Sequence, residues 1–308
     1  MAEPRLSRAE ANLLEEELAR LAAALAPITV RGLYYQAVIS ALLDFITKDK
    51  EGGRTYYRMV QGRVLSLRRS GLIAWDDVVD ESRPDYSFDR WTSPAGFAET
   101  APLYYRLDTW ADQPIRPLVM VEKAGQVPVY RRHADRFGID VAACKGYSSA
   151  SHLRGVAEGI ADWIHGQGQQ VQVLVCADFD PSGNDWPRAA EVEIRDHLRR
   201  SGGPVMADLG LLPFRRVLVT PADLEQLGSA VAFRAPNPKD TRTGSFLDQY
   251  GFTADQEVCV EMDAISPADA RDRLELIYRE LYQGDLDKST ERQQEHRQTI
   301  TEALASLA

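Results

Sequence analysis

The chain has 308 residues, of which 44% are hydrophobic and 27% are charged, an ordinary composition for a globular protein with one large or two medium domains. Its 36 basic and 46 acidic residues give a formal net charge of −10, which argues against a protein that coats nucleic acid but not against a DNA enzyme with a local basic face. No apolar run approaches the roughly 20 residues of a bilayer span, and no secretory signal opens the chain. The three scattered cysteines form no zinc or disulfide pattern. We therefore expect a cytoplasmic protein without membrane attachment.

The first third of the chain predicts a small helical unit. Leucines three and four residues apart predict the first helix, which Pro27 ends, and Thr29 is placed to cap the second. In chain order we expect helices over 6–26, 29–47 and 54–69, an extended stretch over 72–79, and a long loop or wing over 82–101. Two short helices followed by an extended stretch resemble a winged helix-turn-helix.

A different pattern begins near residue 114, where apolar runs alternate with amphipathic helices. We expect strands over 118–121, 139–144, 171–176 and 216–220, and helices over 127–137, 148–165 and 185–200. This alternation predicts a mostly parallel α/β sheet covered on both faces. Further along, we expect a strand over 258–262 and helices over 267–281 and from 289 onward. The chain is thus expected to comprise an N-terminal helical arm (1–27), a winged-helix domain (28–113) and an α/β domain with a C-terminal extension (114–308).

Three carboxylates follow two of the predicted strands. Glu122 stands directly after the first strand, and Asp178 and Asp180 follow the third. The carboxyl ends of parallel strands line the ligand crevice, and neighbouring strands lie about 4.8 Å apart, so the three side chains could converge on one or two hard cations. Mg²⁺ prefers a few carboxylates together with waters and phosphate oxygens. The plainer alternative is that these carboxylates cap helices or face solvent.

Other residues near these carboxylates suit a phosphate or a metal. Lys123 and the small-residue loop that contains Lys145 supply cations, while Pro181 and Gly183 predict a turn after the aspartate pair. Glu261 and Asp263 flank Met262 after a later predicted strand, and they are further candidates for a role near the metal.

The second predicted helix carries an arginine and two tyrosines. Arg31 and Tyr35 are spaced i, i+4 and are therefore neighbours on the helix surface. Tyrosine is a poor nucleophile at neutral pH, since its pKa is about 10, but a guanidinium beside it can stabilise a forming phenolate or clamp the phosphate that it attacks. Periodicity does not choose between Tyr34 and Tyr35, and tyrosines on an apolar helix face usually belong to the core.

The third predicted helix has a basic face. Between residues 52 and 75 there are five arginines and no acidic residue. Helical geometry places Val60, Val64 and Leu67 on one side, with Tyr57. The opposite side carries Arg54, Arg58, Gln61 and Arg69. A helix with an apolar docking side and a basic side suits DNA backbone phosphates, although a solvated charged face is an equally simple interpretation.

The segment from about 116 to 220 resembles the Toprim domain of topoisomerases, primases and some nucleases. The resemblance rests on Glu122 after one strand, Asp178-x-Asp180 after a later strand, Gly146 between them, and the Pro-x-Gly that follows. Together with the Arg-x-x-Tyr-Tyr helix in a winged-helix pattern, it extends to the A subunit of topoisomerase VI and the related meiotic double-strand-break transesterase. The chain resembles a short bacterial or phage relative of this family.

The resemblance implies attack of Tyr35 on a DNA phosphate, giving a 5′-phosphotyrosyl link, with Arg31 stabilising charge and Mg²⁺ held by Glu122, Asp178 and Asp180. From the basic helix and the cations beside the carboxylates, we expect DNA contacts from Arg54, Arg58, Arg69, Lys123 and Lys145. The resemblance also implies a nucleoid-associated homodimer in which the tyrosine of one protomer meets the metal of the other. Topoisomerase VI keeps its ATPase on a separate subunit, and this chain contains no phosphate-binding P-loop motif. Two alternatives stay open: a Toprim nuclease of a mobile-element or defence system, in which metal-activated water attacks, and a DNA-binding protein with an inactive Toprim domain.

Overall fold

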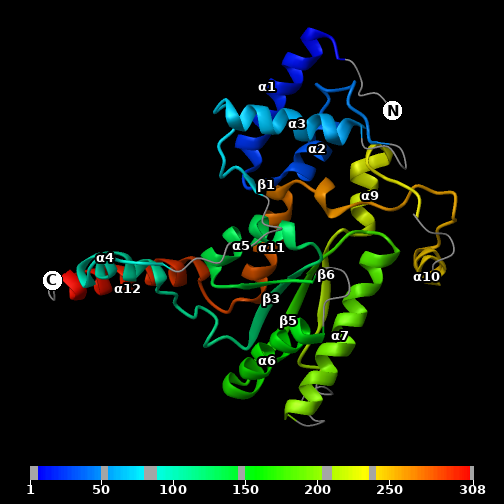
Figure 1. Cartoon of the computed structure of the whole chain (residues 1–308). Helices are drawn as coiled ribbons and strands as arrows, with labels where there is room; N and C mark the ends of the chain where they lie inside the picture. The colour runs from blue at the N-terminus through cyan, green and yellow to red at the C-terminus, as the bar shows by residue number, and fades with distance from the viewer. Residues whose placement is uncertain are drawn as a thin grey trace.

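The structure is a computed structural model that describes residues 6–49, 55–79, 89–144, 150–202, 210–235 and 241–305. It is a mixed α/β protein with a four-stranded, all-parallel sheet, as the sequence predicted (Figure 1). Three N-terminal helices lie beyond the carboxyl end of this sheet, and two further helices, α4 and α12, project from the body as a pair.

The N-terminal unit contains α1 (Arg8–Leu25), α2 (Val30–Ile39) and α3 (Thr55–Arg69). Two short strands, β1 (Ile28–Thr29) and β2 (Val78–Val79), pair in parallel beside them. Ser7 begins α1 with a capping box, and the Thr29 hydroxyl accepts a hydrogen bond from the Gly32 amide at the start of α2. These caps satisfy backbone amides that have no partner inside a helix.

The second helix is shorter than predicted. It ends at Ile39 rather than near residue 47, because Ser40 turns into an extended conformation. The Ser40 hydroxyl donates to the buried Glu17 carboxylate of α1 at 2.9 Å, which holds the chain at this turn. Leu43 and Ile46 are nevertheless buried. The apolar residues that predicted a longer helix therefore pack into the core from an irregular segment.

The main sheet comprises β3 (Ile115–Val121), β4 (Asp140–Ala143), β5 (Gln170–Cys176) and β6 (Phe214–Leu218). Their order across the sheet is β4-β3-β5-β6. The chain therefore leaves β3 toward one edge and returns to the other side of it with β5. In open parallel sheets, the crevice at such a reversal of strand order is where ligands bind.

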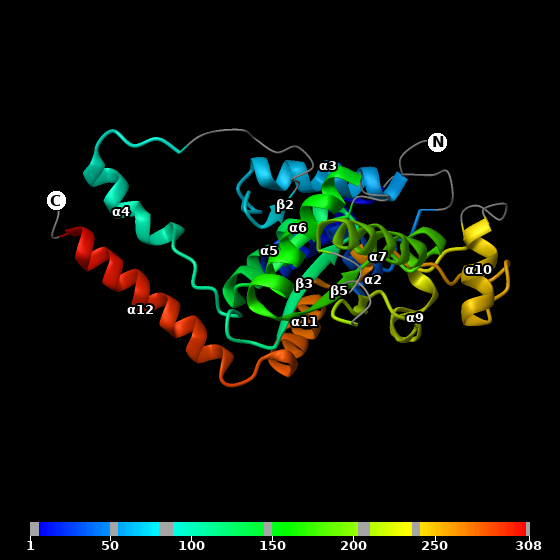
Figure 2. The ribbon, with the colours of Figure 1, turned by 90° about the horizontal axis from the view of Figure 1, so that it is seen from below.

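Helices cover both faces of this sheet, as predicted. Leu118 and Met120 of β3 pack with α6 (Ala150–Gln167) and α7 (Pro181–Gly202), while Val119 and Val121 face α5 (Val127–Ala134) and α11 (Pro267–Leu281). Strand side chains alternate between faces, so each central strand is apolar on both sides. Figure 2 shows the helices above and below the strands.

Two further predicted elements differ in type from the structure. The expected strand over 258–262 is reduced to two isolated bridges, Phe179 with Val260 and Phe233 with Cys259, followed by the 3-10 turn η4 (Met262–Ala264). Part of the expected loop over 82–101 is α4 (Pro94–Tyr104), which Ser93 caps and which Pro94 opens at a position where proline is favourable. Residues 80–88 of that loop lie outside the described ranges.

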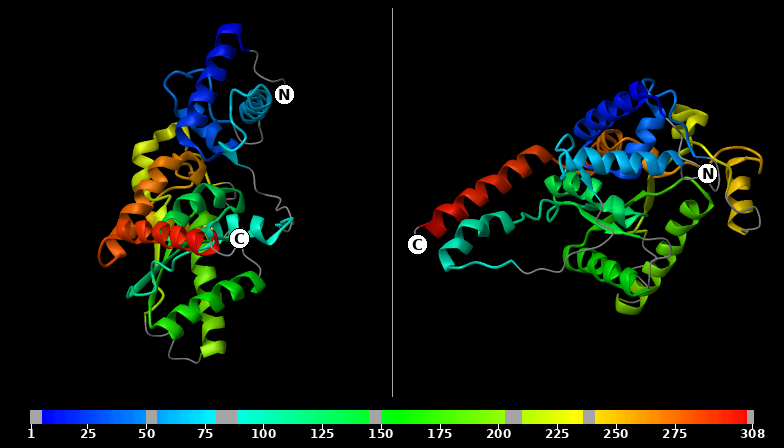
Figure 3. Two further views of the ribbon diagram at one scale, coloured as in Figure 1. Left: turned by 90° about the vertical axis from the view of Figure 1, so that its left-hand side faces the viewer. Right: turned by 45° about the horizontal axis from the view of Figure 1, so that its top comes forward.

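Among the described residues, three further helices lie in the second half of the chain: α9 (Pro221–Leu227), α10 (Thr241–Tyr250) and α12 (Leu286–Ala305). Short 3-10 turns are η1 (Ala124–Gln126), η2 (Asp135–Phe137) and η3 (Gly228–Ala230). The α4–α12 pair is visible as an extended arm in Figure 3. At its base the Tyr105 hydroxyl lies 2.7 Å from His296 Nδ1. Within the described ranges, no helix has the length and apolar character needed to cross a membrane.

Candidate active site at the carboxyl end of the sheet

The predicted carboxylates lie at the reversal of strand order between β3 and β5. Glu122 directly follows β3, and its amide donates to the Cys176 carbonyl at the end of β5 at 2.9 Å. Asp178 comes two residues after β5, and its amide donates to Glu122 Oε2 at 2.9 Å. The structure therefore brings Glu122 and Asp178 together, as expected from parallel strands.

The two carboxylates nevertheless point in different directions. Glu122 continues the β3 positions that face α7, while Lys123 and Asp178 continue the positions that face the opposite side, toward the N-terminal helices. This follows from the two-residue alternation of strand side chains. Burial, reinforced by the charge of Asp180, raises the pKa of Glu122.

Asp178 is 6% exposed and both of its oxygens are occupied. Oδ1 accepts a hydrogen bond from the Met262 amide at 2.8 Å, and Oδ2 pairs with Lys123 Nζ at 2.9 Å. Burial raises the pKa of Asp178; Lys123 works against this effect, while Glu122 adds to it.

Asp180 is the residue that caps α7. Its Oδ1 accepts hydrogen bonds from the Gly183 amide at 2.7 Å and the Ser182 hydroxyl at 2.8 Å. Pro181 and Gly183 were expected to form a turn, but they lie in the first turn of α7, whose start is four residues earlier than predicted. Asp180 therefore caps a helix in this structure, as the plainer alternative predicted, and a role in metal binding would be additional to this cap.

Whether the site can bind Mg²⁺ depends on the carboxylate oxygens of Glu122, Asp178 and Asp180. No group of three metal-ligating side chains is assembled among the residues that the structure describes. Glu122 and Asp180 are close enough that the charge of Asp180 raises the pKa of Glu122, and they lie at the positive N-terminal end of α7. Hard oxygen donors that repel one another suit a hard cation, and Mg²⁺ often uses only one or two carboxylates. The donor set therefore fits Mg²⁺ at Glu122 and Asp180, whereas Lys123 holds Asp178.

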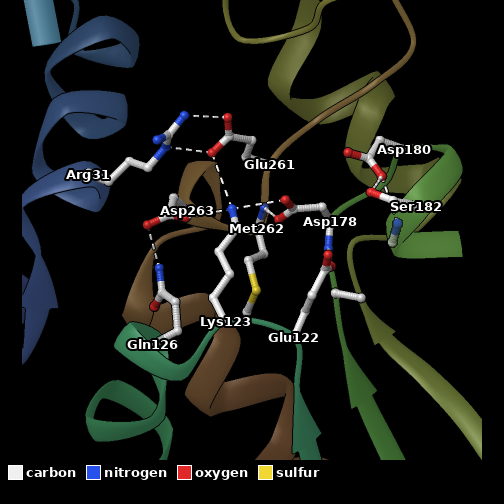
Figure 4. A network of polar contacts seen from close by, with 12 residues as sticks. Arg31, Glu122, Lys123, Gln126, Asp178, Asp180, Ser182, Glu261, Met262 and Asp263 are labelled. Carbon is white, nitrogen blue, oxygen red and sulfur yellow. Dashed lines mark hydrogen bonds and ion pairs between the residues drawn. The ribbon is translucent and has the colours of Figure 1, made fainter. Parts of the chain in front are cut away.

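Lys123 is surrounded by carboxylates (Figure 4). Its Nζ lies 2.9 Å from Asp178, 3.1 Å from Asp263 and 3.2 Å from Glu261. Asp263 also accepts hydrogen bonds from Thr29 and Gln126. In this structure Lys123 serves as a counter-ion to these carboxylates, and its predicted contact with DNA stays a prediction.

Helix α2 joins this network through Arg31. The guanidinium forms a two-pronged contact with Glu261, with Nε and Nη2 each 2.5 Å from one carboxylate oxygen. Gln36, farther along the helix, donates to the Ala264 carbonyl at 3.1 Å. The segment from Glu261 to Ala264 therefore contacts α2 on one side and Asp178 on the other.

Both tyrosines of α2 are buried. Tyr34 Oη accepts a hydrogen bond from the Asp49 amide at 2.7 Å, and burial raises its pKa to about 12. Tyr35 is 2% exposed; burial raises its pKa further, the charge of Glu261 adds to this effect, and Arg31 opposes it. The Tyr35 hydroxyl is thus neutral and enclosed, close to the carboxylate network.

The basic face of α3 is arranged as predicted. Val60, Val64 and Leu67 are buried, while Arg58 and Arg69 are exposed on the other side. Two other arginines of the helix have internal partners: Arg63 pairs with Glu15, and Arg68 stacks on Trp75 and donates to its carbonyl at 2.8 Å. Of the predicted DNA contacts, Arg54 and Lys145 lie outside the described residues.

A cavity of about 190 Å³ opens between the N-terminal helices and the loop after β3. Arg31 and Lys123 line it, together with Gln61 from the exposed side of α3 and Asp263. The cavity therefore borders the network and the basic helix at the same time.

One residue of this region was not anticipated from the sequence. Arg216 in β6 is half-buried, and its guanidinium donates to the carbonyls of Gly183 at 2.6 Å, Val219 at 3.0 Å and Asp178 at 3.2 Å. It thereby ties the loop between Asp178 and Gly183 to the neighbouring strand. The available signal was that Arg216 occupies a position in β6 two residues before the buried Leu218, on the same face of the strand.

The comparisons with known proteins give no family assignment. No protein-family model matches the chain, and no curated protein matches it.

Proposed function

We propose that this protein cleaves DNA by metal-dependent tyrosine transesterification, with Tyr35 as the nucleophile. The observation that carries the proposal is the line of ion pairs from Arg31 through Glu261 and Lys123 to Asp178. It connects the helix that bears the tyrosine with the carboxyl ends of the two central strands. The resemblance to the A subunit of topoisomerase VI, with a winged-helix unit before a Toprim domain, agrees with this arrangement.

In the proposed reaction, Tyr35 Oη attacks a DNA phosphorus atom and the bond to the ribose oxygen breaks. The phenol proton leaves Tyr35, the departing ribose oxygen gains a proton, and the phosphate stays attached as a 5′-phosphotyrosyl ester. Arg31 is the nearby charge that favours the phenolate. Glu122 and Asp180 would hold Mg²⁺, with Asp178 as a further ligand once Lys123 releases it, and the ion would supply charge neutralisation at the phosphate.

The enclosed position of Tyr35 means that α2 must move before the hydroxyl can reach a phosphate. The resemblance implies a homodimer. In a homodimer, the movement of α2 would bring the tyrosine of one protomer to the carboxylates of its partner. The exposed Arg58 and Arg69 of α3 are the proposed contacts to the DNA backbone.

The burial of Tyr35 also favours a second candidate function, metal-dependent hydrolysis of DNA by water. In that case both tyrosines serve packing and the same carboxylates are required. A covalent-trapping assay separates the two candidates. End-labelled duplex DNA is incubated with the protein and Mg²⁺, denatured, and examined for label that migrates with protein.

We expect an adduct that Tyr35→Phe and Asp178→Ala both lose. Tyr34→Phe is the matched control, since it removes a hydroxyl from the adjacent buried ring and should keep the adduct. Free nicks that survive Tyr35→Phe but not Asp178→Ala would assign the hydrolytic reaction. DNA binding with no cleavage and no metal requirement would assign a binding protein with an inactive centre.

A further inference from the structure

We propose that the Glu261 carboxylate occupies the place of a substrate phosphate, so that the adjoining cavity is a phosphodiester subsite closed by the protein's own side chain. The inference rests on the proposed function for the identity of the phosphate, which is that of a DNA backbone. It concerns binding alone and involves no covalent step.

The contact between Arg31 and Glu261 has the geometry by which arginine binds phosphate. Both carboxylate oxygens receive a guanidinium nitrogen at 2.5 Å, and Oε2 also lies 3.2 Å from Lys123 Nζ. A phosphate presents two oxygens with nearly the same spacing and accepts the same paired hydrogen bonds. The Glu261 carboxylate therefore occupies an anion-binding site formed by the Arg31 guanidinium and the Lys123 ammonium group.

The two cations that hold Glu261 also line the 190 Å³ cavity. Gln61 lines the same cavity from the exposed side of α3, next to Arg58. A DNA backbone that lies along the basic face of α3 would therefore pass the mouth of the cavity. This continuity gives a phosphate a route to Arg31 and Lys123.

The local charge explains why the subsite is closed. The ammonium and guanidinium groups face three carboxylates, those of Asp178, Glu261 and Asp263, so an incoming phosphate meets an excess of negative charge. Asp263 is held by Thr29, Gln126 and Lys123, and Asp178 by the Met262 amide. In the described part of the chain, the Glu261 carboxylate is held only by the two cations, Arg31 and Lys123. It is therefore the carboxylate that a phosphate can replace.

The test compares Glu261→Gln with Glu257→Gln in the absence of Mg²⁺. Both variants remove one negative charge from the same segment, but Glu257 is exposed and does not contact Arg31 or Lys123. Two probes are used: a labelled 20-base-pair duplex, by fluorescence anisotropy at several salt concentrations, and inorganic pyrophosphate, by calorimetry. Thermal unfolding of each variant is measured beside binding, and Glu261→Asp, which keeps the charge, serves as a second variant.

We expect Glu261→Gln to bind both probes about tenfold more tightly than the unsubstituted protein, since it frees a charged receptor for another anion. The salt dependence of duplex binding should steepen by about 0.9 in the log–log slope for one additional phosphate contact. Glu257→Gln and Glu261→Asp should stay near the original affinity, and Arg31→Ala added to Glu261→Gln should abolish the gain.

Equal gains for Glu261→Gln and Glu257→Gln, or no gain for a folded Glu261→Gln, would overturn the inference. A gain with pyrophosphate alone, without any duplex binding, would support the subsite and count against the proposed DNA function. Duplex binding and covalent adducts that do not respond to Glu261→Gln would leave the proposed function in place and refute the subsite.

Discussion

Gly183 lies where the aspartate loop meets the start of α7, and alanine at this position gives a direct test of the geometry. A Cβ atom on Gly183 would lie 2.2 Å from the Asp178 carbonyl oxygen, 2.9 Å from its carbon and 3.0 Å from Glu122 Oε2. Side-chain carbons do not approach backbone atoms this closely, so the loop and the helix would have to separate by about 1 Å. Overpacking of this kind costs about 1–3 kcal/mol.

We therefore expect Gly183→Ala to lower the melting temperature by several degrees, since each kcal/mol corresponds to about 2–4 °C in a protein of 150–250 residues, and less in a larger one. The separation would also disturb the Asp178 amide bond to Glu122, so the same variant should bind Mn²⁺ more weakly. Differential scanning calorimetry and Mn²⁺ titration measure the two effects.

Gly62→Ala is the matched control for this experiment. Gly62 lies in the interior of α3, and a Cβ there meets nothing within 4 Å. Alanine is favoured over glycine in a helix interior by about 0.5–1 kcal/mol, so this variant should be slightly stabilised. If Gly183→Ala were as stable as Gly62→Ala, the close approach of α7 to the aspartate loop would be refuted.

Three further perturbations test other parts of the structure. Trp110 is fully buried and donates to the Phe137 carbonyl at 2.8 Å, so Trp110→Ala should lower the free energy of unfolding by about 3–5 kcal/mol in urea titrations, and a loss below about 1 kcal/mol would contradict its burial. Burial lowers the pKa of Lys48 to about 8 in the folded protein, whereas in the unfolded chain it is near 10.4. Between about pH 8 and pH 10.4 the unfolded state therefore binds more protons than the folded state, so the free energy of unfolding should increase with pH in this range. Lys48→Met should remove that part of the rise, and an unchanged pH profile would count against the burial of the ammonium group. Glu122→Gln and Asp180→Asn should each weaken Mn²⁺ binding about tenfold or more in spin-resonance titrations, while Asp255→Asn at an exposed turn should leave it unchanged; equal affinities in all three would place the metal elsewhere.

The sequence predicted those features that follow from local periodicity. The buried and exposed sides of α3 were expected from a 3.6-residue repeat, and the parallel sheet from short apolar runs between helices. The meeting of Glu122 and Asp178 followed from the general geometry of strand ends.

Features that depend on distant residues were not predicted. The ion pairs of Lys123 with Glu261 and Asp263 were not predicted, because nothing near Lys123 in the chain shows that these carboxylates lie against it. The end of α2 depends on a hydrogen bond from Ser40 to Glu17 in another helix. The Pro-x-Gly after the aspartate pair is compatible with either a turn or a helix start, and the carboxylate of Asp180 stabilises the helix start.

The two helices of the α4–α12 arm are far apart in the sequence, so the ribosome synthesises them at different times. About 180 residues separate the end of α4 at Tyr104 from the start of α12 at Leu286. At roughly 5–20 residues per second, α4 waits about 10–35 s for its partner. Phe97 and Leu103 of α4 stay exposed even in the complete molecule. The Glu261–Ala264 segment also emerges late, so the carboxylate network closes only after the sheet has been made. A nascent chain stalled before residue 261 would hold Asp178 without the Met262 amide that now donates to it, and during synthesis the candidate site would be among the last parts of the molecule to form.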